Sequence, residues 1–384
     1  MVNSARSYFD HAATAPLRPE AREALLENLD WLNPSGQYAS ARAAKRVLEE
    51  AREQIARLLG CDPVEVVFTS GGTEADNLAI SGLYFASSGS KIYIPDFEHE
   101  AVLKTAAHLE KEHWAQIEWM PIDAGGRLAI KQLPKFDAAQ TAVVSCMWAN
   151  NETGAIQPIP ELVDALASSA GRKIPLHVDA VQAVGHLPIN FHASGAATLA
   201  ISGHKFGGPR GIGALLVRRD VRLIAHNNGG GQERGIRSGT QDVASAAAMA
   251  AALQAAINEQ EAETARLRGL QQELIQAIAS IEGAVVHTNE PSLPGHVFAS
   301  FPGAEGDSLI MLFDAAGIEC STGSACNAGV NRPSHVLLAM GVPEATARGA
   351  IRFTMGWNTT EDDVKSVISV LSDTVARARL AGMA

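Results

Sequence analysis

The feature that most constrains the fold of this chain is an alternation of short apolar runs with helical segments over its first two thirds. The runs are Glu65–Ser70, Lys91–Pro95, Thr141–Met147, Pro175–Asp179, Ala197–Ser202 and Gly213–Val217. They are continuous in apolar residues rather than alternating with polar ones, which is typical of strands buried on both faces. Helical patterns begin near Thr73, His99 and Ile159, between these runs. The pattern predicts an α/β fold with a mostly parallel sheet covered by helices on both faces.

The last third of the chain predicts a second, smaller unit. A helical pattern runs from about Asp242 to about Ser280, longer than most globular helices, and we expect it to bridge two domains. Beyond it, VFASF, IECST and IRFTM read as strands, and helices are predicted near 307–316, 334–340 and 360–377. This mixture indicates a smaller α+β domain at the C-terminus.

Charge and cysteine spacing exclude several classes of protein. The 384 residues carry a net charge of −11 and no run of Lys or Arg, which argues against a nucleic-acid-binding surface. The four cysteines, Cys61, Cys146, Cys320 and Cys326, form no CxxC pair, so we expect neither a disulfide framework nor a metal site.

The expected location is cytoplasmic. The first residues, MVNSARSYFDHAAT, lack the apolar segment of a signal peptide. The most apolar segment, the alanine-rich stretch from Val243, is too short to span a bilayer. We therefore expect a reducing compartment and no membrane contact.

Polar clusters follow four of the predicted strands, at the edge where open α/β sheets hold their sites. They read SGGTEADN, WANNETG, DAVQ and SGHKFGG. Lys205, in SGHKFGG, is either a solvated loop lysine or an amine whose pKa falls in a desolvated pocket, where it forms a Schiff base with an aldehyde such as pyridoxal 5'-phosphate, PLP. Asp179, at the end of a buried strand, is either a helix cap or the carboxylate partner that a PLP pyridine nitrogen needs.

The remaining parts of a PLP site are also present at strand ends. SGGTE offers Gly71, Gly72 and Thr73 at a helix start, where backbone N–H groups bind phosphate, although such turns are common. His99 begins a helix and is either a surface residue or a ring-stacking catalyst. Asn151 and Gln182 are turn residues or hydrogen-bond partners of the ring hydroxyl.

At this point the sequence resembles a known family, the cysteine desulfurases of the class V aminotransferase group, which belong to fold type I of the PLP enzymes. More narrowly, it is similar to the housekeeping and nitrogenase-type desulfurases. The resemblance covers nearly the whole chain through YFDHAATAPL, VVFTSGGTEADNLAI, EHEAVL, NNETG, HVDAVQAVG, SGHKFGGPRGIGALLVRR, GGGQERGIRSGT, GIECSTGSAC, PSHVLLAMG and IRFTMG. It implies a seven-stranded sheet in a large domain at 15–258, and a small domain formed by 1–14 and 259–384.

The resemblance also implies a role for each site residue. Lys205 would hold PLP and act as acid and base at the substrate Cα, Asp179 would pair the pyridinium, and His99 would stack on the ring and move protons. Asn151 and Gln182 would contact the ring oxygen, and Arg352 with Asn151 would bind the substrate, with Arg352 clamping its carboxylate. The phosphate ligands would be Gly72, Thr73, Ser202 and His204, joined by Thr240 from the other subunit of a homodimer.

Cys326 lies in the glycine- and serine-rich stretch STGSACNAG, among residues that suit turns rather than a core. In this family such a cysteine takes sulfur from L-cysteine, leaving L-alanine, and passes it to an acceptor for iron–sulfur assembly or tRNA thiolation. We expect a mobile loop at about 321–331 to carry it. The segment NPSGQYAS departs from the family pattern, with Tyr38 where histidine is common, and Cys320 is interpreted as a packing residue.

Two other functions compete with this hypothesis. A selenocysteine lyase or another class V PLP aminotransferase needs no cysteine nucleophile, so Cys326 argues against it. A catalytically inactive sulfur-relay scaffold would not need Lys205, Asp179, His99 and Arg352 together.

Overall fold

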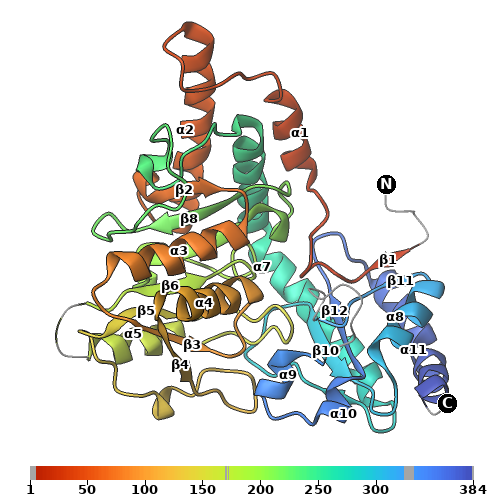
Figure 1. Ribbon diagram of the computed structural model, residues 1–384. Helices are drawn as coiled ribbons and strands as arrows, with labels where there is room; N and C mark the ends of the chain where they lie inside the picture. The colour runs from red at the N-terminus through yellow and green to blue at the C-terminus, as the bar shows by residue number, and fades with distance from the viewer. Residues whose placement is uncertain (1–5, 169–170, 172, 324–332, 383–384) are drawn as a thin grey trace.

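The computed structural model describes residues 6–168, 171, 173–323 and 333–382. Its centre is a seven-stranded sheet in the order β2–β8–β7–β6–β5–β3–β4 (Figure 1). The strands are β2 (Val66–Thr69), β3 (Lys91–Pro95), β4 (Gln116–Met120), β5 (Thr141–Ser145), β6 (Leu176–Asp179), β7 (Thr198–Ser202) and β8 (Gly213–Val217). Among these seven strands, β8 alone runs antiparallel to the others. The mostly parallel seven-stranded sheet that we expected is confirmed.

The edge strand β4 was the one that the apolar pattern missed. Its sequence, QIEWM, places Gln116 and Trp119 at the surface and mixes polar with apolar residues. An edge strand has one neighbour and an exposed side, so it does not carry the continuous apolar run of a central strand.

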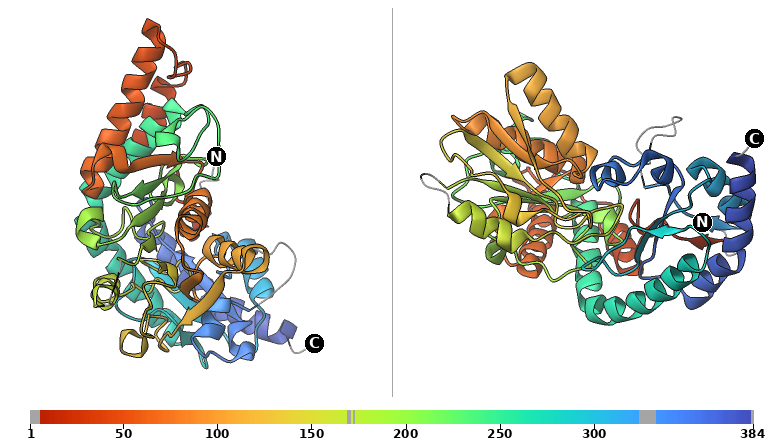
Figure 2. Two further views of the ribbon diagram at one scale, coloured as in Figure 1. Left: turned by 60° about the vertical axis from the view of Figure 1, so that its left-hand side comes forward. Right: turned by 90° about the horizontal axis from the view of Figure 1, so that it is seen from below.

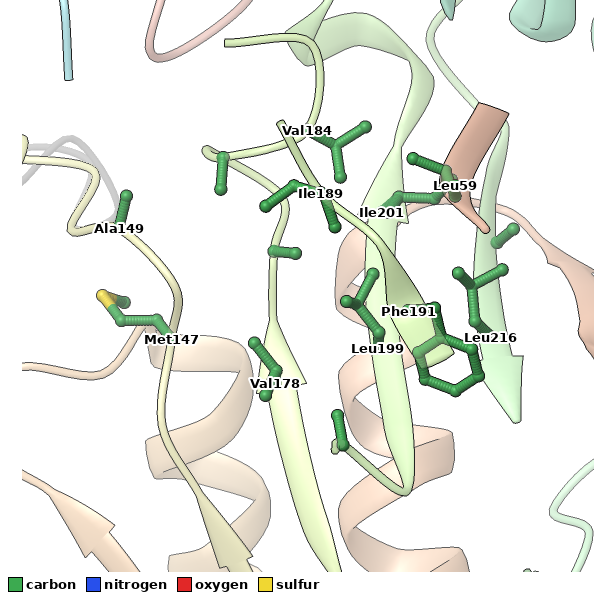
Figure 3. Close-up of a cluster of buried hydrophobic side chains, with 14 of the residues drawn as sticks. Leu59, Met147, Ala149, Val178, Val184, Ile189, Phe191, Leu199, Ile201 and Leu216 are labelled. Carbon is green, nitrogen blue, oxygen red and sulfur yellow. The ribbon is translucent and has the colours of Figure 1, made fainter. Parts of the chain in front are cut away.

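Consecutive residues of the central strands pack on opposite faces of the sheet, because side chains alternate along a strand. On one face lie Val178, Leu199, Ile201 and Leu216, packed against Phe191 (Figure 3). Phe68 belongs to the same cluster. The opposite face presents another set, which includes Val67, Ala200, Leu215 and Val217. Both faces are therefore buried, which is why the strand sequences show no alternation.

Helices cover both faces. The helices α3 (Gly72–Ala86) and α4 (Glu100–His113) pack side by side on the face of Val67 and Leu215. The helices α2 (Ala39–Leu59), α5 (Ile159–Ala167), α6 (Phe191–Ser194) and the first half of α7 (Val243–Ala279) cover the face of Phe68 and Leu199. The short α1 (Pro19–Glu27) packs against α7. In the described part of the chain, 3₁₀ turns lie at Pro63–Glu65, Ile130–Gln132, Gly203–Lys205 and Glu233–Gly235.

A second buried cluster holds the C-terminal part of the chain together with the N-terminal residue Phe9. It contains a three-stranded sheet in the order β12 (Ala350–Thr354), β10 (His296–Ser300) and β9 (Val285–Val286), and the pair β1 (Ser7–Tyr8) with β11 (Ile318–Glu319). Its helices are α8 (Gly306–Ala315) and α11 (Glu361–Gly382), while α9 (His335–Ala339) and α10 (Glu344–Ala347) lie beside the first cluster.

The long helix α7 connects the two parts. Its first half packs against α1 and α2, and its second half contributes Leu267, Leu270, Leu274 and Ile278 to the second cluster. Figure 2 shows this helix running from one lobe to the other. It spans Val243–Ala279, with Asp242 as its N-cap, close to the bounds expected from the sequence.

The domain boundaries 15–258 and 259–384 stay a prediction. Some C-terminal residues, such as Phe298, Val336 and Leu337, pack with the first cluster rather than the second. Among the described helices, none is long and apolar enough to cross a membrane.

Candidate active site

A cavity of about 480 Å³ opens at the carboxyl ends of the parallel strands. Its walls come from the segments that follow β2, β3, β5, β6 and β7, together with the N-terminal residues 12–14 and Arg352 of β12. Parallel strands end at the same edge of a sheet, so polar residues far apart in sequence meet there. The cavity has the size of a typical cofactor site.

Lys205 ends the 3₁₀ turn that follows β7 and lies on the cavity wall. Its Nζ donates hydrogen bonds to the main-chain oxygens of Ala12, at 2.5 Å, and Ala13, at 3.1 Å. Lys205 is half-buried, and both of these hydrogen bonds are to neutral carbonyl groups. The Lys205 amine can react with an aldehyde once it is deprotonated.

Asp179 and His99 face the same cavity. Asp179 Oδ1 accepts a hydrogen bond from the Val181 N–H at 2.9 Å. Burial raises the pKa of Asp179, while His99 and Lys205 oppose this rise. A buried carboxylate of this kind is well suited to pair with a cationic ring nitrogen.

His99 is the N-cap of α4, and its Nδ1 accepts the Ala101 N–H at 3.1 Å. The neutral ring therefore carries its proton on Nε2. Burial lowers the pKa of His99, with Asp179 acting in the opposite sense, which favours this neutral form. In this state Nε2–H is a donor, and the ring can accept a second proton, on Nδ1, only after its hydrogen bond from the Ala101 N–H breaks.

The start of α3 forms a cradle with spare hydrogen-bonding groups. Gly71 has φ +153°, a conformation essentially restricted to glycine. A Cβ on Gly213 of β8 would lie 2.7 Å from the Gly71 Cα, so a side chain there would displace the turn. Ser202 Oγ is buried beside this turn and has no partner among the described residues. An unpaired buried hydroxyl next to helix N–H groups fits the binding of a phosphate group.

Arg352 is almost fully buried on β12. Its Nη1 donates to the Asn151 main-chain oxygen and its Nη2 to Asp10 Oδ1, both at 2.7 Å, while Nε is buried without a partner in the described chain. The guanidinium is thus fixed in place with donor capacity to spare, which fits the recognition of a carboxylate.

The other expected residues divide into three groups. Gly72, Thr73, Asn151, Gln182, Ser202 and His204 line the cavity with Lys205, Asp179, His99 and Arg352. Thr240 is exposed and does not line it in this chain. Cys326 lies outside the described residues, as do 324–332 as a whole.

Two of the lining residues have partners of their own. Gln182 Nε2 donates to the Ala12 oxygen at 2.8 Å, and His204 Nδ1 lies 3.1 Å from Thr14 Oγ1. Burial, with the charges of Lys205 and Arg210, lowers the pKa of His204 to about 4. The ring is therefore neutral near pH 7.

Sequence reasoning missed two buried acids near Asp179, which are Asp76, on the cavity wall, and Glu98. Asp76 Oδ1 lies 3.2 Å from His177 Nε2, and Glu98 Oε1 accepts the Ser145 hydroxyl at 3.1 Å. Burial, and then the Asp179 carboxylate, raises the pKa of Glu98 to about 8. The position of Glu98 between a buried strand and His99, in FEHEAV, was the available signal.

The N-terminal segment was also missed as part of the site. The motif YFDHAAT supplies Asp10, which pairs with Arg352, and the carbonyl groups of Ala12 and Ala13. Main-chain carbonyls have no sequence signature, so this contribution depends on the tertiary fold.

Comparisons with known proteins show the family and the fold of this chain. The chain matches the family described as "Aminotransferase class-V" over residues 7–367. It is 48% identical to an "IscS-like cysteine desulfurase" of Mycobacterium tuberculosis over 98% of both chains. It is 40% identical to the "Cysteine desulfurase IscS" of Dictyoglomus turgidum over 97% of this chain and 95% of the relative.

Solved structures with this fold include a "NIFS-LIKE PROTEIN", with a TM-score of 0.90 and 31% identity over 97% of this chain and all of the other. Another, described as "SspA in complex with cysteine", has a TM-score of 0.79 and 31% identity, and covers 91% of this chain and 98% of its own.

Proposed function

This chain belongs to the class-V aminotransferase family and is a PLP-dependent cysteine desulfurase, and we propose that it removes sulfur from L-cysteine in the cavity described above. The observation that carries the proposal is the meeting of Lys205, Asp179 and Arg352 on the walls of one cavity. These side chains supply an amine for the cofactor aldehyde, a carboxylate for its ring nitrogen and a cation for an amino-acid carboxylate. Bound PLP supplies an electron-withdrawing ring that stabilises negative charge at the substrate Cα.

The residues around the ring would each bind a different part of the cofactor. Lys205 would hold the cofactor through Nζ and, once released, would remove the proton from the substrate Cα and return one. Asp179 would keep the ring nitrogen protonated. His99 would lie against the ring, and Asn151 and Gln182 would bind the ring oxygen.

The start of α3 is the proposed phosphate site. The Gly72 and Thr73 N–H groups and the Ser202 hydroxyl would donate to it, with His204 beside them. Thr240 joins from the other subunit of a homodimer. Exposed apolar side chains support such a dimer, since Leu26, Leu29 and Leu32 are 62%, 59% and 63% exposed.

Arg352 binds the carboxylate of L-cysteine, with Asn151 beside it. Its ion pair with Asp10 holds the guanidinium in place before substrate arrives. A fixed arginine orients the substrate so that its sulfur meets the attacking thiolate.

Cys326 carries out the sulfur transfer in this proposal. Its thiolate forms an S–S bond with the substrate sulfur as the Cβ–S bond breaks, and the electron pair of that bond remains on the substrate carbon, which is protonated. L-Cysteine thereby becomes L-alanine, and Cys326 is oxidised from a thiol to a persulfide. The reaction balances without an external oxidant.

The persulfide sulfur then passes to an acceptor protein. We propose an acceptor of iron–sulfur cluster assembly or tRNA thiolation, and a reducing compartment such as the cytoplasm, which keeps the carrier thiol free.

The first prediction tests this assignment with two variants. Cys326→Ala should keep the visible absorbance of bound PLP but release no L-alanine from L-cysteine in the presence of a reductant, because the sulfur has no nucleophile. Lys205→Ala should lose the Schiff-base absorbance. Cys320→Ala is the matched control and should turn over like the native chain. Native L-alanine production by Cys326→Ala would contradict the proposed role of this thiol.

A further inference from the structure

A buried glutamate contacts both ends of the segment that contains Cys326. Glu152 is only 2% exposed. Its Oε2 accepts a hydrogen bond from the Ser334 hydroxyl. The same oxygen lies 3.2 Å from the position that a Cβ on Gly323 would occupy. Gly323 and Ser334 flank residues 324–332 in the sequence, so one carboxylate is hydrogen-bonded to the chain on one side of them and lies beside it on the other.

The turn that carries Glu152 is also connected to the active site. Asn150 Oδ1 accepts the N–H groups of Glu152, at 2.9 Å, and Thr153, at 3.0 Å. The next residue in this turn, Asn151, lines the cavity, and its main-chain oxygen binds Arg352. The carboxylate is therefore held at a fixed place relative to the substrate-binding arginine.

A main-chain bridge connects the same parts from the other side. The Arg352 N–H donates to the Ser321 oxygen at 2.6 Å, and the Ser321 N–H donates to the Arg352 oxygen at 3.2 Å. Ser321 Oγ in turn accepts the Gly323 N–H at 3.1 Å. Hydrogen bonds thus connect Arg352 to Ser321 and Ser321 to Gly323, and Gly323 lies beside Glu152.

His335 adds a further contact on the Ser334 side. Its Nε2 donates to the Glu98 main-chain oxygen at 3.1 Å, and its Nδ1 lies 4.0 Å from Glu152 Oε1. The first of these contacts connects residues 334–335 to the residue that precedes His99.

Packing alone does not account for a glutamate here. Burial of a carboxyl group is costly, and an apolar side chain of similar volume often serves stability as well or better. Burial raises the pKa of Glu152, while His335, Ser334 and Arg352 act in the opposite sense. The carboxylate lies between Gly323, Ser334 and the substrate-binding Arg352. This position suggests a function that would offset the free-energy cost of its burial.

We propose that Glu152 is a positioning residue for sulfur transfer, which holds both ends of the Cys326 segment at a fixed distance from Arg352 and the substrate that Arg352 binds. This inference rests on the proposed function. It concerns the approach of the carrier thiol and not the binding of PLP or of L-cysteine.

The test compares Glu152→Gln with the native holoenzyme. The variant should bind PLP with native absorbance and show the native affinity for L-alanine, followed by the spectral change on binding. The rate of persulfide formation on Cys326, measured by alkylation and mass spectrometry in a single turnover with L-cysteine, should fall about 10-fold or more, since small misplacements of reacting groups are costly. Amide hydrogen exchange should accelerate in the peptides covering 319–323 and 333–340.

Glu100→Gln is the matched control. Glu100 lies near Glu152 and His335, but the ion pair of its side chain is with Lys104, at 3.0 Å, and not with Gly323 or Ser334. The control should behave like the native chain in all four measurements. Gly323→Ala is a second variant: its Cβ would lie 3.2 Å from Glu152 Oε2 and 3.3 Å from the Phe298 ring, and its φ of +84° is one that alanine adopts only with strain, so both effects would displace this end of the segment. This variant should reproduce the slow persulfide formation.

The outcomes separate the two proposals. If the native chain forms no persulfide on Cys326, the proposed function is wrong. If it does, and Glu152→Gln forms persulfide at the native rate, the positioning role is wrong and the function stands. Loss of PLP binding in both Glu152→Gln and Gly323→Ala would also overturn the inference, because it would assign Glu152 to general stability.

Discussion

At the scale of single residues, the site consists of ionisable groups whose surroundings set their charge. Asp179 is buried at the end of β6, with the cationic Lys205 near it. His99 is kept as the Nε2–H form by its cap bond to Ala101. A cofactor that carries a phosphate and a protonated ring brings charges that complement these groups.

The buried acid Glu98 makes the stability of this protein depend on pH. Its folded pKa is about 8 and its ordinary value is 4.5, so between these values the native state binds more protons than the unfolded chain. The free energy of unfolding must then fall as pH rises through this window, and the stabilising contribution is complete only below about pH 4.5.

Replacing Glu98 with glutamine should remove this dependence, because the amide is neutral at every pH and can still accept the Ser145 hydroxyl. Relative to the native holoenzyme, Glu98→Gln should gain on the order of 2 kcal/mol of unfolding free energy between pH 6 and pH 8. Denaturant titrations at both pH values measure this. The exposed Glu110→Gln serves as the control, and parallel pH profiles for the native chain and Glu98→Gln would count against a proton on Glu98.

Several site residues were predictable at this scale and others were not. Asp179 is the last residue of β6, and Lys205 and His99 come three and four residues after β7 and β3, so the local pattern located them. Asp10 was in a motif that we quoted, but its pairing with Arg352 joins residues 342 positions apart. No local pattern contains such a contact.

At the scale of elements, the phosphate cradle depends on a close approach between β8 and the start of α3. Thr69 and Ser202 both pair with Gly213 in the sheet, which sets β8 between β2 and β7. Gly213 has no side chain where the Gly71 backbone crosses it. The strand and the helix can therefore lie close enough to form one anion site.

Gly213→Ala should damage this site. The new Cβ would lie 2.6 Å from the Ile201 oxygen and 2.7 Å from the Gly71 Cα, and both are backbone atoms that cannot move aside cheaply. We expect a loss of about 1–3 kcal/mol in stability. The affinity for PLP should fall more than the affinity for pyridoxal, which lacks the phosphate.

The control for this variant is Gly269→Ala in the exposed middle of α7, where a Cβ would meet nothing within 4 Å. It should stabilise the chain by about 0.5–1 kcal/mol through helix propensity. A folded Gly213→Ala protein with the native ratio of PLP to pyridoxal affinity would show that the cradle does not depend on this approach.

At the scale of the whole molecule, one expected phosphate ligand is absent from the cavity of its own chain. Thr240 is exposed, in a loop held in place by a buried ion pair between Arg52 and Glu233, at 2.7 Å. Gln241 Nε2 adds a hydrogen bond to Glu233 at 2.9 Å. The loop is thus well anchored but presents Thr240 outward, which supports a role for this residue in a second subunit.

Mixed dimers can test this role. Thr240→Ala homodimers should bind PLP roughly 10-fold more weakly, because a hydrogen bond to a charged group is lost. In a mixed dimer of one Thr240→Ala chain and one Lys205→Ala chain, the only intact lysine site receives Thr240 from its partner. That site should recover the native rate of PLP dissociation. If it stays as weak as the Thr240→Ala homodimer, Thr240 acts within its own chain.

The sequence by itself determined six strands of the central sheet, the long helix α7 and the order of the strand-end motifs. A strand buried on both faces leaves a continuous apolar run, and a helix leaves a period of 3.6 residues, because burial within one element follows the geometry of that element. The same locality places Lys205, Asp179 and His99 at strand ends. These features are readable without any knowledge of distant contacts.

Only the tertiary structure decided how distant segments complete the site. The Ala12 and Ala13 carbonyls reach Lys205 across more than 190 positions, Asp10 reaches Arg352, and Glu152 touches Gly323 and Ser334. Such contacts depend on the three-dimensional path of the backbone and on the close approach that glycine permits. Their energies come from burial and geometry, which no spacing within a single segment of sequence records.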